Sequence, residues 1–294
     1  MLYKQIEQNK RKTILLMLLF SVTVLVIGWA VGYLFNGDYF SGPIIALIIL
    51  AIYLPITYMS ANAQVLKMSG AKEIQKEDNP MLFNIVEELS LAARIPMPKI
   101  YIVNDPAPNA FATGTKPENG VVAFTTGLLE RLNREELEGV AAHEIAHIRN
   151  YDIRLMTVCI ALVAVVALIA EIGMRMFYVR GGRNRNQRTH PALLILAIVF
   201  VILAPLAARF VHFAVSRNRE YLADATAVEL TRNKVGLKNA LIKISHSDLD
   251  VKKATEASAA MYISNPFRNK TKKKTNWFAT HPPIESRVER LENM

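Results

Sequence analysis

The sequence predicts an α-helical membrane protein with about four apolar segments and an α+β domain on the cytoplasmic side. Two observations lead to this fold class. Hydrophobic residues make up 52% of the 294 residues and the mean hydropathy is +0.20, which is high for a soluble protein. The apolar residues are gathered in long runs with few charges, and the stretches between these runs have the periodicity of amphipathic helices and short strands.

The chain carries a net charge of +10. In a membrane protein, a basic excess of this kind favours contact with anionic lipid at the cytoplasmic surface. The lipid bilayer is therefore the expected partner, and nucleic acid is not. Cys159 is the only cysteine and cannot form an internal disulfide. It lies in an apolar run, where we expect a small buried core residue.

Residues 1–66 are predicted to form an N-terminal transmembrane hairpin. Residues 13–35 carry no charge and are long enough to cross a bilayer as a helix, and residues 39–66 form a second uncharged stretch. The first run is too long for the core of a signal peptide and lacks an Ala-x-Ala cleavage site, so we expect an uncleaved anchor. The short segment 36–42 is rich in turn residues and suits a tight connection.

Basic residues predict the orientation of this hairpin. The segment 36–42 contains no Lys or Arg, whereas both flanks of the hairpin are basic. The flanking residues are Lys4, Lys10, Arg11 and Lys12 before the first run, and Lys67, Lys72 and Lys76 after the second. By the positive-inside rule, the N-terminal tail and the chain that follows the second run face the cytoplasm.

Residues 155–215 are predicted to form a second membrane hairpin. Its two apolar runs are residues 155–174 and 191–215. Five arginines lie between these runs, which breaks the positive-inside rule if both runs cross the bilayer. Full spanning and a hairpin that dips into the bilayer without crossing it therefore both stay open.

Residues 67–154 and 216–294 are predicted to form the cytoplasmic domain. The first part begins with an amphipathic helix, for which Asn79 suits the N-cap and Pro80 the first turn. The apolar face of this helix consists of Leu82, Ile85, Val86 and Leu89. The stretches "PKIYIVND", "NAFATG" and "GVVAFTT" follow and are typical of short strands.

A long helix is predicted to begin near Asn133. No proline and only one glycine, Gly139, follow up to residue 172. We therefore expect this helix to continue without a break into the third apolar run. The second part of the domain is expected to contain a helix over "RNREYLADATAVEL" and to end in a helix over "PPIESRVERLEN".

The long helix carries "AAHEIAHIRNYD", in which His143, Glu144 and His147 form an H-E-x-x-H motif. Residues four apart on a helix project from one face, about 6 Å apart along the axis, so the two histidines can hold one ion. Zinc suits imidazole ligands, and Glu144 can accept a proton from an attacking water. The motif predicts a zinc-dependent peptidase site. An ordinary helix with two hydrogen-bonded histidines is the alternative.

A catalytic zinc needs a third protein ligand. "RNREYLADATAVEL" offers Glu220 and Asp224, four residues apart on a helix. Glu220 is the candidate ligand, and Asp224 is the candidate for orienting a ligand histidine. The alternative is an exposed helix whose two acidic residues bind no metal. The presence of an H-E-x-x-H motif upstream makes this alternative less favoured. Asp152, five residues beyond His147, is rotated off the ligand face of a continuous helix, so we interpret it as structural.

Four motifs together resemble the gluzincin family of membrane-bound zinc proteases, which also contains the zinc-dependent endopeptidases of prenylated proteins. They are "NAFATG", "TTGLLERLNREELEGVAAHEIAHIRNYD", "SRNREYLADA" and "THPPIESRVERL", in this order. The likeness covers nearly the whole chain, including both apolar hairpins. It implies a gluzincin-type α+β metalloprotease domain with one Zn²⁺ per chain, held by His143, His147 and Glu220, and with Glu144 as the general base.

The resemblance also implies further site residues. An edge strand beside the cleft would pair with an extended substrate backbone. This strand consists of Asn109, Ala110, Phe111 and Ala112. His281 in "THPP" would donate a hydrogen bond to the oxyanion of the tetrahedral intermediate, and Arg287 would orient His281 or pair with an acid. The alternatives are a plain strand and structural roles for His281 and Arg287.

The expected function is hydrolysis of peptide bonds in misfolded or damaged membrane proteins, on the cytoplasmic side of a bacterial inner membrane, as stress-related quality control. Protein substrates, mainly membrane proteins, are the expected partners, and the oligomeric state stays open. The alternatives are a zinc endopeptidase of prenylated proteins, a non-catalytic zinc-binding membrane scaffold, and a transport protein that uses Glu171 or Arg209 within the bilayer. Glu144 argues against the scaffold, because structural zinc does not require it. Both intramembrane charges lie near segment ends, where they can snorkel.

Overall fold

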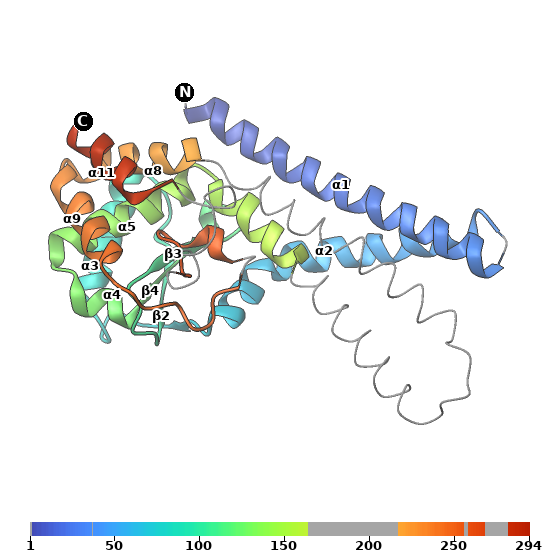
Figure 1. Cartoon of the computed structure of the whole chain (residues 1–294), viewed down its shortest axis with the longest axis horizontal. Coiled ribbons are helices and arrows are strands. Elements are labelled where there is room, and N and C mark those ends of the chain that lie inside the picture. Colours follow the sequence, from blue (N-terminus) through green and yellow to red (C-terminus); the bar gives the residue numbers. More distant parts are fainter. Residues whose placement is uncertain (1, 37, 164–216, 256–257, 268–281) are drawn as a thin grey trace.

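Two long helices project together from one side of an α+β domain in the computed structural model (Figure 1). The structure describes residues 2–36, 38–163, 217–255, 258–267 and 282–294. The predicted second membrane hairpin therefore lies almost entirely outside the described residues, together with Glu171, Arg209 and His281. Whether residues 155–174 and 191–215 span a membrane stays a prediction, as does the division of the chain into domains.

The projecting helices are α1 (Leu2–Asn36) and α2 (Ser41–Ser69), which form the predicted hairpin. Both are long and apolar enough to cross a membrane. Small residues let them approach closely near the connection: a Cβ atom added to Gly42 would lie 1.9 Å from the carbonyl oxygen of Gly28. Large apolar side chains remain exposed along both helices, as expected of a surface that faces lipid.

The domain contains a four-stranded mixed sheet with the strand order β1-β2-β4-β3. Strands β2 and β4 pair in parallel, and the other two pairs are antiparallel. The strands are β1 (Lys72–Glu73), β2 (Lys99–Val103), β3 (Ala110–Thr113) and β4 (Val121–Thr125). The three predicted strands are confirmed. The sequence does not reveal β1, because its two exposed residues are too few to show an alternating pattern.

Helix α3 (Pro80–Ala93) begins where its cap predicts. The side chain of Asn79 accepts a hydrogen bond from the backbone N–H of Leu82 at 3.1 Å, and Pro80 occupies the first turn. The predicted apolar face of α3 is buried. After the short helix α4 (Thr126–Arg131), α5 (Arg134–Arg149) begins with a reciprocal cap, in which Asn133 and Glu136 each bind the other's backbone N–H.

The helix of the H-E-x-x-H motif does not continue into the third apolar run, so this prediction is wrong. Helix α5 ends at Arg149, and a new helix starts at residue 152 and is described up to residue 163. Tyr151 lies between them with a φ of 59°, a left-handed conformation that interrupts the helical hydrogen bonds. A tyrosine carries no sequence signal for such a break, whereas a glycine would.

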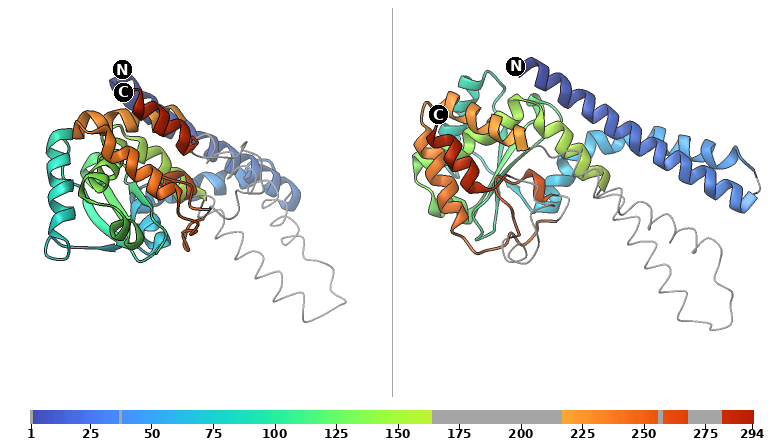
Figure 2. Two further views of the ribbon diagram at one scale, coloured as in Figure 1. Left: turned by 60° about the vertical axis from the view of Figure 1, so that its left-hand side comes forward. Right: turned by 45° about the horizontal axis from the view of Figure 1, so that its top comes forward.

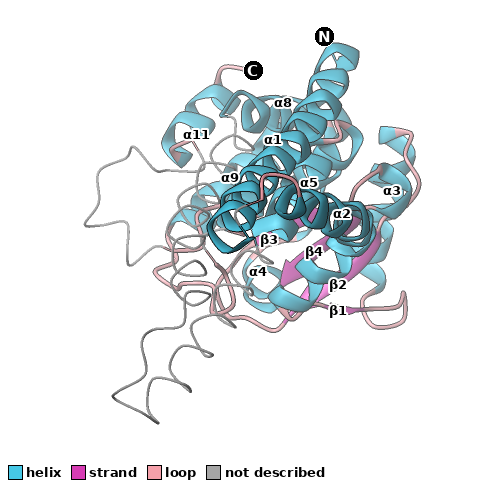
Figure 3. Cartoon of the chain, turned by 90° about the vertical axis from the view of Figure 1, so that its right-hand side faces the viewer, coloured by secondary structure: helices cyan, strands magenta, loops and turns pink. Residues whose placement is uncertain are grey.

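Helix α5 is the centre of the domain. It lies between the sheet and the helices α8 (Arg217–Thr231) and α9 (Lys234–Ser245), and α3 packs along it (Figure 3). Gly139 brings α5 against α9, because a Cβ atom there would lie 2.5 Å from the backbone nitrogen of Leu237. The short turns η1 (Pro117–Asn119) and η2 (Ala259–Met261) and the last helix α11 (Ile284–Glu292) complete the domain.

The two helices of the hairpin also contact the domain. Figure 2 shows the first turns of α1 alongside the domain, while the rest of α1 leaves it together with α2. Leu16 and Leu50 of the hairpin pack against Leu155 and Cys159 from the start of the third apolar run. Cys159 is buried there, as predicted for a core residue.

Candidate metalloprotease site

His143 and His147 project from one face of α5 toward a common point. Their Nε2 atoms lie 3.1 Å apart, and the two rings are perpendicular. The short separation follows from the four-residue spacing on the helix. His143 is completely buried, and the side chain of His147 is 14% exposed at the edge of a pocket.

Glu220 reaches the same point from α8. Its carboxylate oxygens lie 3.8 Å from Nε2 of His143 and 3.6 Å from Nε2 of His147. The three candidate ligand atoms all lie within 4.8 Å of one another. Zinc bonds of 2.0–2.1 Å in a tetrahedron place neighbouring ligand atoms about 3.4 Å apart, so two imidazoles and a carboxylate at these distances fit one zinc ion.

Glu144 lies beside this point with a buried carboxylate. Neither carboxylate oxygen forms a well-aligned hydrogen bond among the described residues, with only a weak contact from the backbone N–H of Ala112, although the side chain is only 1% exposed. Burial raises the pKa of Glu144 to about 8, and the charge of Glu220 adds to the effect. A buried carboxyl without a well-aligned partner is costly, which indicates that its partner is a metal, a water or a substrate atom at the site.

Asp224 and Arg287 support His143 from behind. Nδ1 of His143 lies 3.0 Å from Asp224, and Arg287 on α11 donates two hydrogen bonds to the same carboxylate, at 2.8 and 2.6 Å. Burial disfavours the charged form of Asp224, but Arg287 and the hydrogen bonds hold its pKa below its ordinary value. Burial and the Arg287 cation lower the pKa of His143 to about 4, so this imidazole is neutral.

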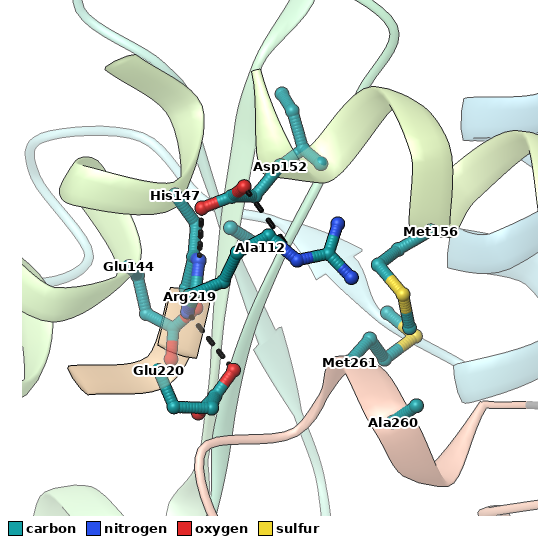
Figure 4. Close-up of a pocket in the computed structure, with 10 residues that line it drawn as sticks. Ala112, Glu144, His147, Asp152, Met156, Arg219, Glu220, Ala260 and Met261 are labelled. Atoms are coloured by element: carbon teal, nitrogen blue, oxygen red, sulfur yellow. Dashed lines mark hydrogen bonds and ion pairs between the residues drawn. The ribbon is translucent and has the colours of Figure 1, made fainter. Parts of the chain in front are cut away.

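Asp152 supports His147 in the same manner. Its Oδ2 lies 3.0 Å from Nδ1 of His147, and Figure 4 shows His147 between Asp152 and Glu220. Burial would lower the pKa of His147, but the hydrogen bond to Asp152 and the charge of Glu220 raise it to about 9. The prediction that Asp152 faces away from the site is wrong, because the helix break at Tyr151 turns it back toward His147.

The predicted pairing of Arg287 with an acid is present, and its partner is Asp224. Its other predicted role, orienting His281, concerns a residue outside the described part of the chain. The sequence did not reveal Asn9 and Arg219, which both contact Asp152 from other elements. Asn9 belongs to no motif or periodic pattern, and Arg219 lies within "SRNREYLADA" as one of several polar residues, so no local signal marked their contact with Asp152.

Strand β3 is the edge strand of the described sheet, next to α5. The chain's own segment 259–264 partly covers its outer side: Ile263 donates to the carbonyl of Ala110 at 2.9 Å, and Phe111 forms a β-bridge with Tyr262. Asn109 donates from its side chain to the carbonyl of Ser264 at 2.9 Å. Ala112, at the other end of the predicted substrate strand, lines the pocket beside Glu144.

The pocket has a polar wall and an apolar wall (Figure 4). The polar wall consists of Glu144, His147, Asp152, Arg219 and Glu220, and the apolar wall consists of Ala112, Ile153, Met156, Ala260 and Met261. Met156 and Met261 lie together at the far end from the histidine (Figure 4). A polar wall that can hold zinc beside an apolar wall suits a peptide bond with an apolar neighbouring side chain.

Comparison with known proteins agrees with this site. The model of peptidase family M48 matches residues 76–294. Relatives named protease HtpX homolog are 51% identical in Listeria monocytogenes serotype 4a, 49% in Ligilactobacillus salivarius and 48% in Limosilactobacillus reuteri, in each case over all of both chains. The crystal structure of S. mikatae Ste24p covers 99% of this chain and 67% of its own, with a TM-score of 0.48 and 19% identity.

The family match, the full-length relatives and the apolar helices define the class of protein as a membrane-bound zinc metalloprotease. The non-catalytic scaffold and the transport protein are thereby set aside. More particularly, the chain belongs to peptidase family M48.

Proposed function

We propose that the chain hydrolyses peptide bonds of misfolded or damaged membrane proteins at the cytoplasmic face of a bacterial inner membrane. The observation that carries the catalytic part is the convergence of three ligand atoms beside the buried carboxylate of Glu144, which lacks a well-aligned hydrogen bond among the described residues. This arrangement provides both a metal site and a proton acceptor next to it. Quality control of membrane proteins is the biological role that the family resemblance implies.

In this proposal, His143, His147 and Glu220 hold one Zn²⁺ through Nε2, Nε2 and a carboxylate oxygen. When bound, the metal supplies a Lewis acid that polarises the scissile carbonyl and lowers the pKa of water. Asp224 and Asp152 accept the Nδ1–H of His143 and His147, which leaves each Nε2 free to bind the ion.

Glu144 then serves as the general base. Its carboxylate accepts a proton from the attacking water and returns it to the nitrogen of the departing amine. Burial raises its pKa to about 8 in the metal-free site, so the carboxylate is a stronger base than that of an exposed glutamate, which supports this role. His281 would donate a hydrogen bond to the developing oxyanion, in line with the family resemblance.

The substrate backbone would pair with the outer edge of β3, the strand that contains Ala110 to Ala112. Backbone pairing depends little on side chains and suits a protease that accepts many sequences. Because the segment 259–264 occupies the edge at Ala110 and Phe111, an extended substrate would have to displace it or begin its pairing at Ala112.

Two observations support the cytoplasmic orientation. The positive-inside rule places the N-terminal tail in the cytoplasm. Asn9 near the start of α1 is hydrogen-bonded to Asp152 in the protease domain, so the tail and the domain lie on the same side of the membrane. Substrate segments on that side are cytoplasmic loops and unfolded membrane-proximal chains.

The catalytic proposal is tested with the full chain, purified in detergent with a chelator. We expect cleavage of an unfolded protein, and of the chain itself, to begin when zinc is added. Glu144→Gln should abolish cleavage, whereas Glu138→Gln, a half-buried glutamate on the same helix, should not. Zinc binding without cleavage by the unmodified chain, or cleavage that survives in Glu144→Gln, would refute the assignment.

The orientation is tested with single cysteines in a Cys159→Ala background. Tyr39→Cys lies in the connection between α1 and α2, and Lys72→Cys lies in the domain. An impermeant thiol reagent should label position 39 in intact cells, and should label position 72 only after the cells are opened. The reverse pattern would place the protease domain outside.

A further inference from the structure

The first helix of the membrane hairpin brings a buried polar side chain to the metal site. Asn9 lies in α1 shortly before the uncharged run that starts at Thr13, and it is only 1% exposed. Its side-chain nitrogen donates to Oδ1 of Asp152 at 2.6 Å and to the backbone carbonyl of Asn150 at 3.1 Å. These two acceptors flank Tyr151, at the break between α5 and the following helix.

Asp152 connects this contact to the candidate zinc ligand. Its two oxygens face different partners: Oδ1 is held by Asn9, and Oδ2 lies 3.0 Å from Nδ1 of His147. A carboxylate that is held at one oxygen cannot rotate freely about its Cβ–Cγ bond. The orientation of the His147 ring therefore depends on Asn9 through Asp152.

The oxygen of the Asn9 side chain faces the element that carries the third candidate ligand. Arg219 donates from Nη1 to Oδ1 of Asn9 at 3.4 Å, and its Nε lies 4.0 Å from Asp152. Arg219 is buried and immediately precedes Glu220 on α8. One amide from α1 thus contacts both parts of the domain that supply candidate ligands, the end of α5 and the start of α8.

An anchoring helix does not require a buried amide at this place. An apolar side chain would pack against the domain without the desolvation cost of an amide, as Leu16 and Phe20 do further along α1. The polar atoms of Asn9 are instead matched to a carboxylate, a carbonyl and a guanidinium, and a hydrogen bond to a charged group is one of the stronger contacts a buried amide can make.

We propose that Asn9 is a positioning residue for the zinc ligand His147, acting through Asp152, so that the membrane helix α1 is a working part of the metalloprotease site as well as an anchor. This inference rests on the proposed role of His147 as a zinc ligand. It predicts that a substitution in α1, outside the family-matched region 76–294, changes the affinity of the site for zinc.

The test measures zinc affinity of the full chain in detergent, by competition with a chromophoric chelator, in a Glu144→Gln background that prevents self-cleavage. Asn9→Leu and Asn9→Ala should each weaken zinc binding by about tenfold, the lower end of the range for outer-shell partners of metal ligands. The leucine variant keeps most of the side-chain volume, so it separates the lost hydrogen bonds from a cavity.

Thr13→Val is the matched control. Thr13 is also buried on α1, one turn further on, and its hydroxyl donates to the backbone carbonyl of Asn9 at 2.9 Å without reaching Asp152. Thr13→Val should leave zinc affinity unchanged, even if the substitution lowers the thermal midpoint of the metal-free protein. Asn9→Asp combined with Asp152→Asn exchanges the two groups and should bind zinc more tightly than either single variant, because the hydrogen bond between them returns.

In the chain that retains Glu144, Asn9→Leu should lower kcat at saturating zinc and leave KM unchanged. The inference is overturned if Asn9→Leu and Thr13→Val bind zinc equally well. It is also overturned if the double variant Asn9→Asp, Asp152→Asn binds zinc no more tightly than either single variant. His147→Ala separates this failure from that of the proposed function. If His147→Ala binds zinc as tightly as its parent, His147 is not a ligand and both proposals fall.

Discussion

The two histidines of the site lie four residues apart on one helix, yet the carboxylates that hold their Nδ1 atoms are themselves held by different kinds of group. His143 is supported by Asp224, which is paired with the buried cation of Arg287 from α11 inside the protease domain. His147 is supported by Asp152, which is held by the neutral amide of Asn9 from the membrane hairpin. One support is a charged pair within the domain, and the other reaches the domain from α1.

The difference has an electrostatic consequence. Burial and the nearby guanidinium lower the pKa of His143 to about 4, whereas Asp152 and Glu220 overcome burial and raise the pKa of His147 to about 9. In the metal-free protein near neutral pH, His143 is therefore neutral and His147 is protonated. His143 is ready to bind a metal ion, and His147 must first lose a proton.

The largest effect is expected from Arg287→Met, which removes the cation of the charged pair. Arg287 is completely buried, so its loss leaves Asp224 buried beside His143 without compensation. We expect the metal-free chain to lose about 3–5 kcal/mol of unfolding free energy. Chemical denaturation in detergent measures this. Arg290→Met on the exposed side of α11 is the control and should lower the free energy of unfolding much less. An equal loss in both variants would contradict the importance of the buried pair of Arg287 and Asp224.

The two supporting carboxylates should also respond differently. Asp224→Asn and Asp152→Asn should each weaken zinc binding by about 10- to 100-fold, because each orients a ligand histidine. Asp224→Asn weakens two short hydrogen bonds of the completely buried Arg287, whereas Asp152→Asn removes only a 4.0 Å contact with Arg219, so Asp224→Asn should destabilise the metal-free chain more strongly. Chelator competition and denaturation, measured on both variants, separate the two effects. Equal destabilisation by the two substitutions would show that the supports are equivalent.

The pH dependence of zinc binding tests the protonation difference itself. In the Glu144→Gln chain, binding at neutral pH should release one proton from the ligand histidines, because His147 is protonated below about pH 9 and His143 is already neutral. Affinity should therefore rise about tenfold per pH unit up to about pH 9 and then level off. Calorimetry in two buffers of different ionisation enthalpy counts the protons. Release of two protons at a pH too low for zinc-bound water to ionise would show that His143 is also protonated.

The smallest effect is expected at the edge of the α1 contact. The ammonium of Lys10 lies 4.5 Å from the ring centroid of Tyr151, the residue at the helix break. Lys10→Ala should lower the free energy of unfolding by about 0.5–1 kcal/mol, the usual contribution of a partly exposed cation–π contact. The thermal midpoint measures it, with the exposed Arg11→Ala as control. Zinc affinity should stay unchanged, because Lys10 contacts the ring of Tyr151 rather than Asp152. A tenfold loss would assign the positioning effect to the whole contact between α1 and the domain rather than to Asn9.

The sequence by itself determined the features that depend on near neighbours. The four-residue spacing of His143 and His147 brings them to one helix face in any helix, and the caps Asn79 and Asn133 mark helix starts through bonds to residues three positions away. The long uncharged runs predicted α1 and α2, because a span requires many apolar residues in succession. Short stretches typical of strands, separated by Pro and Gly, likewise predicted the three longer strands.

Only the tertiary structure decided which ligand histidine Asp224 supports, which acid Arg287 pairs with, and that Asp152 and Asn9 act beside the other histidine. The left-handed conformation of Tyr151 returns Asp152 to the site, and nothing in a run of helix-compatible residues indicates it. Arg287 meets Asp224, and Asn9 meets Asp152, across separations of 63 and 143 residues. Hydrophobic periodicity does not indicate the hydrogen-bond partner of a single buried polar residue. That partner depends on how helices that are distant in the chain pack together.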